Sequence, residues 1–206
     1  SEIVILGAGT VGEFATRAAI GLGAQVKIFD NRPHRLVRIQ QNLGQRVWTS
    51  TLQPSVLNEA LKTADVAIGA IRGDGSRSPM IVSEAMVSSM KEGAVIIDVC
   101  IDRGGCFETS RITSHENPTY VDQGVIHYCV PNIASSVSGT ASQALSNIIA
   151  PFILSIASDG GVDLAIRSAN VVKSGVYLYK GIITNSDIAD EIGLPFKDLD
   201  LLLATY

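Results

Sequence analysis

Short apolar stretches alternate with helix-like segments along the first two thirds of the chain. The apolar stretches are nearly continuous rather than alternating with polar residues, which is typical of parallel strands covered by helices on both faces. The pattern predicts strands over residues 2–6, 24–30, 46–50, 64–71, 93–101 and 124–130, and helices over 10–22, 33–43, 54–63 and 83–90. A repeating strand–helix order of this kind favours a doubly wound parallel sheet in a three-layer α/β/α fold with right-handed crossovers.

The regular order ends after residue 102. A long loop is expected over 102–124, before the last strand, and the tail over 160–206 mixes turns with a helix-like stretch at 185–193. The tail is therefore expected to be either an appendage on the sheet or part of a second domain.

Residues 123–158 contain no Asp, Glu, Lys or Arg, and their second half has the length of a membrane span. Ser, Thr, Gln, Asn and Pro interrupt that half throughout. Its apolar residues recur at helical spacing, as Ala141, Leu145, Ile148, Phe152 and Ile156. We therefore expect a helix buried on most faces at a domain or subunit interface, and no membrane span.

Composition narrows the class of protein. The 206 residues are 46% hydrophobic and 17% charged, with a net charge of −4, which fits a well-buried globular protein and argues against a nucleic acid or an anionic membrane as partner. Nothing at the first residues resembles a signal peptide. The three cysteines show no metal-ligand or CxxC spacing. Buried thiols in a reducing cytoplasm are expected, with neither disulfides nor a metal site.

A glycine motif lies where the first strand meets the first helix. Its residues are Gly7, Ala8, Gly9, Thr10, Val11 and Gly12, which match the G-x-G-x-x-G of Rossmann-type dinucleotide-binding folds. The first glycine permits a sharp turn, the second lets a pyrophosphate approach the backbone, and the third lets helix and strand pack closely. The helix N-terminus favours the negative charge of the pyrophosphate.

An acidic residue, Asp30, ends the second strand, 18 residues after Gly12 and close to the expected spacing. Its carboxylate would accept hydrogen bonds from a ribose diol and repel a 2′-phosphate, so NAD is predicted rather than NADP. Arg32 and Arg35 follow closely and could meet a phosphate, or could lie on a solvated helix face.

Two polar residues follow later strands, at the edge where such sheets bind ligands. Asp102 precedes two glycines, which would let backbone approach a cofactor, and Asn132 follows Pro131. Asp102 could instead cap a turn, and Asn132 could either bind a ligand or close a turn. His127 lies in an apolar strand and is expected to be a satisfied core histidine.

Several motifs together resemble the alanine dehydrogenase family, which is shared with the NAD-binding part of proton-translocating transhydrogenase. They cover essentially the whole chain: "GAGTVG", "ADVAIGAI", "IDRGGCFETS", "HYCVPNI" and "GVYLYKGIITN". The run "IDRGGCFETS" followed by "HYCVPN" is much more specific than the glycine motif. The resemblance implies reversible conversion of L-alanine to pyruvate and ammonia with NAD, in a homo-oligomer, a hexamer.

The resemblance also implies residue roles. Asp102 would be the active-site aspartate, Asn132 and Ile133 would pack on nicotinamide and substrate, and Ile71 would meet the nicotinamide ribose. Asp30 and Arg35 would contact the adenosine ribose. Two departures from the family are Ile133, often Met, and the loop at 72–79.

In this family the substrate clamp and the catalytic histidine precede the glycine motif, whereas this chain starts at that motif. The expected organisation is therefore an NAD-binding domain at 1–140, and a connecting helix and returning segment at 141–206 that belong to a substrate domain. On its own the chain is expected to be inactive. A transhydrogenase region or a non-catalytic NAD sensor is the alternative. The first is disfavoured by the short spacing after Asp30, and the second by the retained Asp102.

Overall fold

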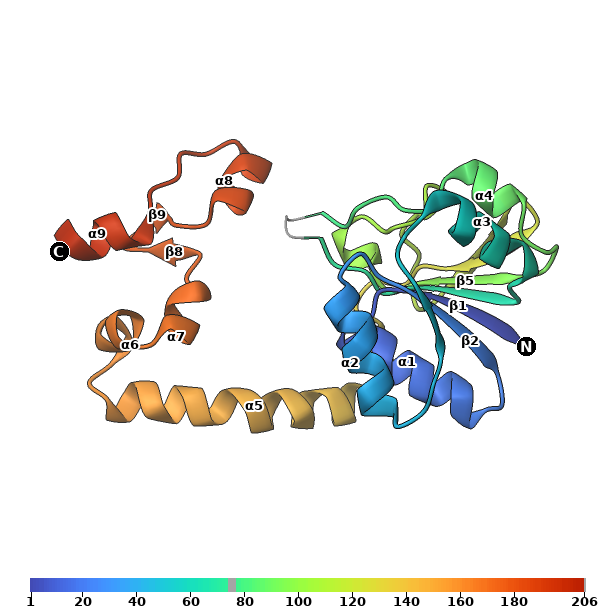
Figure 1. Ribbon diagram of the computed structural model, residues 1–206. Helices are drawn as coiled ribbons and strands as arrows, with labels where there is room; N and C mark the ends of the chain where they lie inside the picture. The colour runs from blue at the N-terminus through green and yellow to red at the C-terminus, as the bar shows by residue number, and fades with distance from the viewer. Residues whose placement is uncertain (74–76, 206) are drawn as a thin grey trace. The chain divides into compact units, whose positions relative to one another are not determined.

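In the computed structural model, which describes residues 1–73 and 77–205, the chain divides after Ile133 into two units (Figure 1). The first unit spans Ser1–Ile133 and holds a seven-stranded sheet, and the second spans Ala134–Tyr206.

The sheet of the first unit has the strand order β3-β2-β1-β4-β5-β7-β6. Every neighbouring pair is parallel except β6 with β7, which is antiparallel. The order reverses between β1 and β4, so this pair is the switch point at which doubly wound folds bind ligands. The strands are β1 (Glu2–Leu6), β2 (Gln25–Phe29), β3 (Trp48–Ser50), β4 (Val66–Gly69), β5 (Val95–Asp98), β6 (Thr119–Asp122) and β7 (Val125–Tyr128).

Helices cover both faces of this sheet (Figure 1). Ile5 of β1 joins a buried cluster with Ala19 and Ile39, which lie on α1 (Thr10–Gly21) and α2 (Pro33–Leu43). Its neighbours Val4 and Leu6 join a second cluster on the opposite face, with residues of α3 (Pro54–Thr63) and α4 (Glu84–Ser88). Successive side chains of β1 therefore enter two different cores, one on each face of the sheet, as expected for the predicted three-layer α/β/α fold.

One predicted loop contains a strand. The segment 102–124 was expected to be irregular, but β6 lies within it and pairs with β7 as an antiparallel edge strand. The sequence Thr119–Asp122 has no apolar run, because an edge strand exposes alternate residues. The turn between β6 and β7 uses Gln123 and Gly124, both with positive φ, which is typical of a two-residue hairpin.

The second unit is mostly helical. A small core forms from residues of its later elements, namely Ile166, Tyr179, Leu199, Leu202 and Leu203. The short strands β8 and β9 pair antiparallel. The elements are α5 (Ser138–Ser158), α6 (Val162–Ser168), α7 (Asn170–Ser174), β8 (Leu178–Tyr179), β9 (Ile182–Ile183), α8 (Ser186–Ile192) and α9 (Leu199–Thr205).

The uncharged helix forms as predicted, but the chain does not bury it. No residue of α5 is buried, and Leu145, Ile148 and Phe152 are 47–63% exposed. The core of the second unit forms around later elements, so the prediction that α5 is buried on most faces is not met within the described chain. The segment Ile133–Ser158 is long and apolar enough to cross a membrane, by length and composition only.

Candidate functional site

The candidate residues lie where successive strands of the first sheet end. The glycine motif follows β1, Asp30 follows β2, Ile71 follows β4, Asp102 follows β5, and Asn132 follows β7. All five strands run in the same direction, so these residues share the carboxyl edge of the sheet. This is the edge at which open α/β sheets bind ligands.

The three glycines of the motif have different surroundings. Gly7 has φ +110°, and a Cβ there would lie 2.4 Å from the carbonyl oxygen of Ala70. A Cβ at Gly12 would lie 1.8 Å from the carbonyl oxygen of Gly7. A Cβ at Gly9 would meet no heavy atom within 4 Å. Gly7 and Gly12 therefore serve close backbone packing, whereas Gly9 leaves open space in front of the helix.

The N-terminus of α1 is available to an anion. Gly9 is its N-cap and supplies no side-chain hydrogen bond, and the first intrahelical bond runs from Glu13 N to Gly9 O. The N–H groups of Thr10, Val11 and Gly12 consequently have no acceptor within the helix. Together with the helix dipole, they form a site that suits a phosphate.

Asp30 is held against the glycine turn. It is only 2% exposed, and its two carboxylate oxygens accept hydrogen bonds from Ala8 N and Arg32 N, both at 2.8 Å. A guanidinium nitrogen of Arg35 lies 3.8 Å from the same carboxylate. The carboxylate thus ties the end of β2 to the turn after β1.

A cavity of about 160 Å³ lies beside Asp30. Since each carboxylate oxygen has two lone pairs, Asp30 keeps acceptor capacity for a ligand in this cavity. The cavity joins the ends of β2 and β4, and its lining includes three arginines. It is lined by Asp30, Asn31, Arg32, Arg35, Ile71, Arg72, Gly73 and Pro79.

One arginine here was not predicted from the sequence. Arg38 donates a hydrogen bond to Ala8 O at 3.2 Å, whereas Arg72, expected on the ligand side of the sheet, lines the cavity beside Ile71. Arg38 lies three residues after Arg35 on α2, so helical spacing could have indicated that both face the glycine turn. The loop 72–79, which departs from the family pattern, includes residues 74–76, and these lie outside the described residues.

Asp102 and Asn132 are joined by a hydrogen bond. Asp102 is exposed in the 3₁₀ turn Ile101–Arg103, and its Oδ1 accepts from Asn132 N at 2.8 Å. Asn132 has φ +49°, a left-handed conformation that Asn tolerates better than most residues. The bond fixes the loop after β5 to the loop after β7. Ile133 follows directly and begins the 3₁₀ turn Ile133–Val137.

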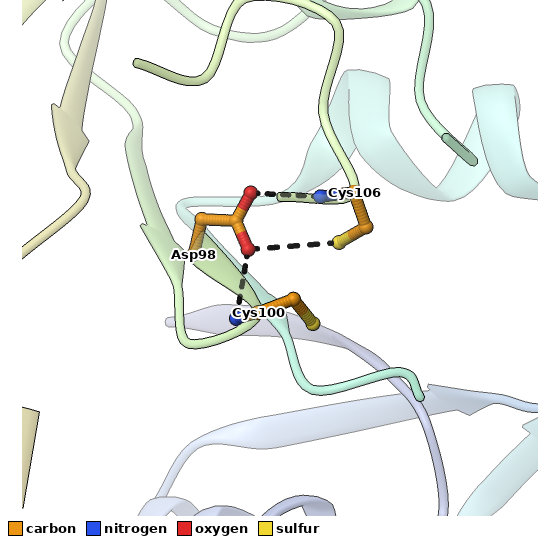
Figure 2. A group of neighbouring side chains, drawn as sticks. All are labelled: Asp98, Cys100 and Cys106. Carbon is orange, nitrogen blue, oxygen red and sulfur yellow. Dashed lines mark hydrogen bonds between the residues drawn. The ribbon is translucent and has the colours of Figure 1, made fainter. Parts of the chain in front are cut away.

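A buried cluster lies beneath Asp102. Asp98, Cys100 and Cys106 hold their ligand-type atoms within 4.8 Å of one another (Figure 2). The neighbouring Cys100 thiol, burial and the charge of Asp98 all raise the pKa of Cys106 well above its usual value. Of the two glycines after Asp102, Gly105 serves this cluster, because a Cβ there would lie 2.7 Å from Asp98, whereas a Cβ at Gly104 would meet nothing within 4 Å.

The remaining sequence predictions concern the core. All three cysteines are free and buried, as expected. His127 is fully buried, with Nδ1 3.0 Å from Val125 O and Nε2 2.8 Å from Thr109 Oγ1. Because a carbonyl can only accept, Nδ1 is the donor and Nε2 accepts from Thr109. His127 is a satisfied core histidine, as predicted.

The candidates thus form two hydrogen-bonded groups on one edge, around Asp30 and around Asp102. A contact links the segments that carry them, since the thiol of Cys100 donates to Ile71 O at 3.0 Å.

Comparisons with known proteins agree with this arrangement. Residues 1–186 match the family described as "Alanine dehydrogenase/PNT, C-terminal domain". The chain is 37% identical to alanine dehydrogenase of Halomonas elongata over 98% of this chain and 54% of that protein. It is 39% identical to the Mycolicibacterium smegmatis enzyme over 99% and 55%. The chain therefore spans about half the length of these relatives.

Solved structures show the same likeness. An L-alanine dehydrogenase structure matches with a TM-score of 0.84 and 37% identity, over 94% of this chain and 53% of that one. The transhydrogenase of Sinorhizobium meliloti matches with a TM-score of 0.71 and 23% identity, over 90% and 50%, which shows a shared fold alone. The chain belongs to the alanine dehydrogenase/PNT family, whose C-terminal domain it matches over residues 1–186.

Proposed function

We propose that this chain is the NAD-binding part of an L-alanine dehydrogenase, which interconverts L-alanine with pyruvate and ammonia. The observation that carries the proposal is the position of the glycine turn and Asp102 on one edge of the sheet, beside the β1–β4 switch point. Membership of the alanine dehydrogenase/PNT family supports a dehydrogenase function for the residues at that edge.

The residues at this edge fit NAD. The open space at Gly9 and the N–H groups of Thr10, Val11 and Gly12 suit the pyrophosphate. Asp30 and Arg35 line the cavity that would take the adenosine ribose. Ile71 is assigned to the nicotinamide ribose, and Asn132 with Ile133 to the nicotinamide ring. When bound, NAD supplies the hydride acceptor for alanine oxidation.

Asp102 is the catalytic residue in this proposal. Its side chain is exposed at the edge, and one oxygen is already oriented by Asn132 N. The same bond fixes the direction of the other carboxylate oxygen, which can orient a proton-transfer group beside the substrate. The hydrogen bond from Asn132 N thereby fixes the orientation of the Asp102 carboxylate near the nicotinamide.

The substrate-binding half is assigned to a region outside these residues. A 2-oxo acid needs a cationic clamp for its carboxylate, ideally a bidentate arginine. Arg72, Arg77 and Arg103, the arginines in the loops after β4 and β5, do not match the clamp positions that the family resemblance implies. The domains are then 1–140 for NAD and 141–206 for the connecting helix and the segment that returns to the substrate domain.

The remaining features support an assembly in the cytoplasm. Three buried, unpaired thiols fit a reducing compartment. The exposed apolar residues of α5 support a homo-oligomer, the hexamer of the resemblance, in which neighbouring parts cover this helix. The Ser, Thr, Gln and Asn residues spaced along α5 favour such packing over a membrane span. The partners are the small-molecule substrates, with no nucleic acid.

A substitution of Asp102 tests the catalytic assignment. The enzyme is completed by fusing this chain to the remaining part of the Mycolicibacterium smegmatis relative, and Asp102→Asn is introduced. Asn keeps an oxygen that can accept from Asn132 N but removes the charge. We expect NAD binding to survive, and turnover of L-alanine to fall about 10²-fold, the scale of a general acid–base contribution.

The matched control is Glu116→Gln, which removes the charge of an exposed carboxylate in the following loop. It should leave turnover unchanged. Near-normal turnover in Asp102→Asn would reduce Asp102 to a residue that closes a turn.

A further inference from the structure

Asp98 is a buried carboxylate to which the proposed function gives no role. It ends β5, is 2% exposed, and every contact that it makes in Figure 2 is with the segment 100–106. Oδ1 accepts from Cys100 N at 3.0 Å, and Oδ2 accepts from Cys106 N at 2.9 Å. Oδ2 also accepts from the Ser110 hydroxyl at 2.7 Å. The carboxylate therefore binds both ends of one loop.

The backbone around Asp98 is shaped for this approach. A Cβ at Gly105 would lie 2.7 Å from Oδ2, and Gly105 has φ +80°. On the other side, a Cβ at Gly69 would lie 3.0 Å from Oδ1 and 2.5 Å from the sulfur of Cys106. Side chains at either position would push the loop away from the carboxylate, so both glycines keep it close.

The loop held in this way carries Asp102. Between the two anchored residues, Arg103 N and Gly105 N donate to Cys100 O at 2.9 Å and 3.1 Å, which closes a tight turn. Asp102 lies at the top of this turn and accepts from Asn132 N. A shift of either end of the loop would move the Asp102 carboxylate relative to that N–H group.

The same three side chains could suggest a metal site, but their hydrogen bonds favour another role. The oxygens of Asp98 are already acceptors for two backbone N–H groups and one hydroxyl. The thiol of Cys100 is a donor to Ile71 O, and a raised pKa keeps Cys106 protonated. A metal would require thiolates and the release of these contacts.

We infer that Asp98 is a positioning residue for Asp102: its carboxylate clamps the ends of the Cys100–Cys106 loop, so that Asp102 meets Asn132 N. The role in catalysis rests on the function proposed above, whereas the clamp itself does not. The clamp requires the carboxylate of Asp98 and the backbone of Cys106, whereas the thiol of Cys106, 3.9 Å from Oδ1, adds only a weak donor.

Amide hydrogen exchange measured by NMR tests the clamp in the 206-residue chain. In Asp98→Asn an amide group faces backbone donors, so one end of the loop is released. We expect exchange of the Asn132 amide to accelerate at least about tenfold, which is the scale of a hydrogen bond to a charged acceptor. Asp102→Ala serves as the reference, because it removes the acceptor of the Asn132 amide itself and should accelerate its exchange in the same way. The amides of β1 and β4 should keep their protection.

Two further variants make the test specific. Ser110→Ala removes the hydroxyl donor to Asp98 and should accelerate Asn132 exchange by a smaller factor in the same direction. Cys106→Ala keeps the backbone donor and removes only the thiol, a weak donor 3.9 Å from Oδ1, so the Asn132 amide should change less than in Ser110→Ala. An unchanged Asn132 amide in folded Asp98→Asn would overturn the inference. If Asp98→Asn does not fold, an unaffected amide in Ser110→Ala would overturn it, as would acceleration in Cys106→Ala equal to that in Ser110→Ala.

The completed enzyme provides the kinetic readout. Asp98→Asn should lower kcat about tenfold and change the KM for NAD by less than about twofold, because the clamp acts on Asp102 and not on the glycine turn. An unchanged kcat beside a faster Asn132 amide would contradict the catalytic role proposed for Asp102, and would leave the clamp supported. A raised KM for NAD with unchanged kcat would contradict the positioning role.

Discussion

Asp30 and Asp98 are two buried carboxylates that hold neighbouring loops in place, after β2 and at the end of β5. Each accepts backbone N–H groups from a neighbouring loop, Ala8 and Arg32 for Asp30, Cys100 and Cys106 for Asp98. The spacing after the glycine motif predicted that Asp30 matters, but not that it binds the motif itself. No spacing rule identifies Asp98, because its partners become visible only when the loop folds back over it.

Asp30 has a testable effect on cofactor choice. Asp30→Ala removes the acceptor for a ribose diol and leaves three arginines, Arg32, Arg35 and Arg72, around the cavity. We expect NADH binding to weaken by roughly 1–2 kcal/mol, the scale of a charge-assisted hydrogen bond, and discrimination against NADPH to decrease. Fluorescence titration of both cofactors measures the two affinities.

The control for this experiment is Glu59→Ala on α3, which removes an exposed carboxylate that pairs with Lys62. It should leave both affinities unchanged. Equal affinity of the unmodified chain for NADH and NADPH would contradict the assignment of Asp30.

At the scale of elements, sequence pattern predicted the interior of the sheet better than its edge. The helices at 10–22, 33–43 and 54–63 match α1, α2 and α3 within a residue. Their apolar periodicity and flanking turns are local signals. β6 was missed because an exposed edge strand needs no apolar run, and its pairing with β7 is a tertiary contact.

The β6–β7 hairpin gives a prediction for pH dependence. Burial lowers the pKa of His127, whose ring stacks on Tyr120 of β6 with ring centroids 4.8 Å apart. The unfolded chain therefore binds a proton at a higher pH than the folded chain. Stability is retained above the unfolded pKa of about 6.5 and is lost as the pH falls below it, by at most about 1.4 kcal/mol per pH unit.

Urea unfolding followed by Trp48 fluorescence measures this loss, since Trp48 lies in β3 of the same unit. His127→Gln removes the titrating group and should flatten the free energy of unfolding between pH 6.5 and 5. The carboxylates are the same in both proteins, so the difference between the two slopes reports His127. An equal slope in both proteins would contradict the prediction.

At the scale of the whole molecule, the chain holds a complete dinucleotide-binding sheet and a second, mostly helical unit. The sequence predicted the change of organisation after the sheet, because the strand–helix order stops there. It predicted less about the packing of α5. An uncharged, apolar helix indicates that its side chains pack against another surface, but its sequence does not identify that surface. Its cover is part of the assembly proposed above, in which neighbouring parts pack on α5.

We propose that these residues bind NAD and that the substrate site lies outside them. Titration of the 206-residue chain with NADH tests it directly. Trp48, the sole tryptophan of the chain, packs against Phe29, the residue before Asp30, with ring centroids 5.2 Å apart. Its emission overlaps NADH absorption, so energy transfer reports binding. Pyruvate and ammonium are then added to the same sample.

We expect saturable quenching of Trp48 at one NADH per chain, followed by a steady NADH absorbance after pyruvate and ammonium are added. The steady signal is expected because a 2-oxo acid held without a carboxylate clamp is not aligned for hydride transfer. Absence of saturable binding would contradict the assignment of the glycine edge to NAD. Rapid loss of NADH would show that the substrate site lies within these 206 residues.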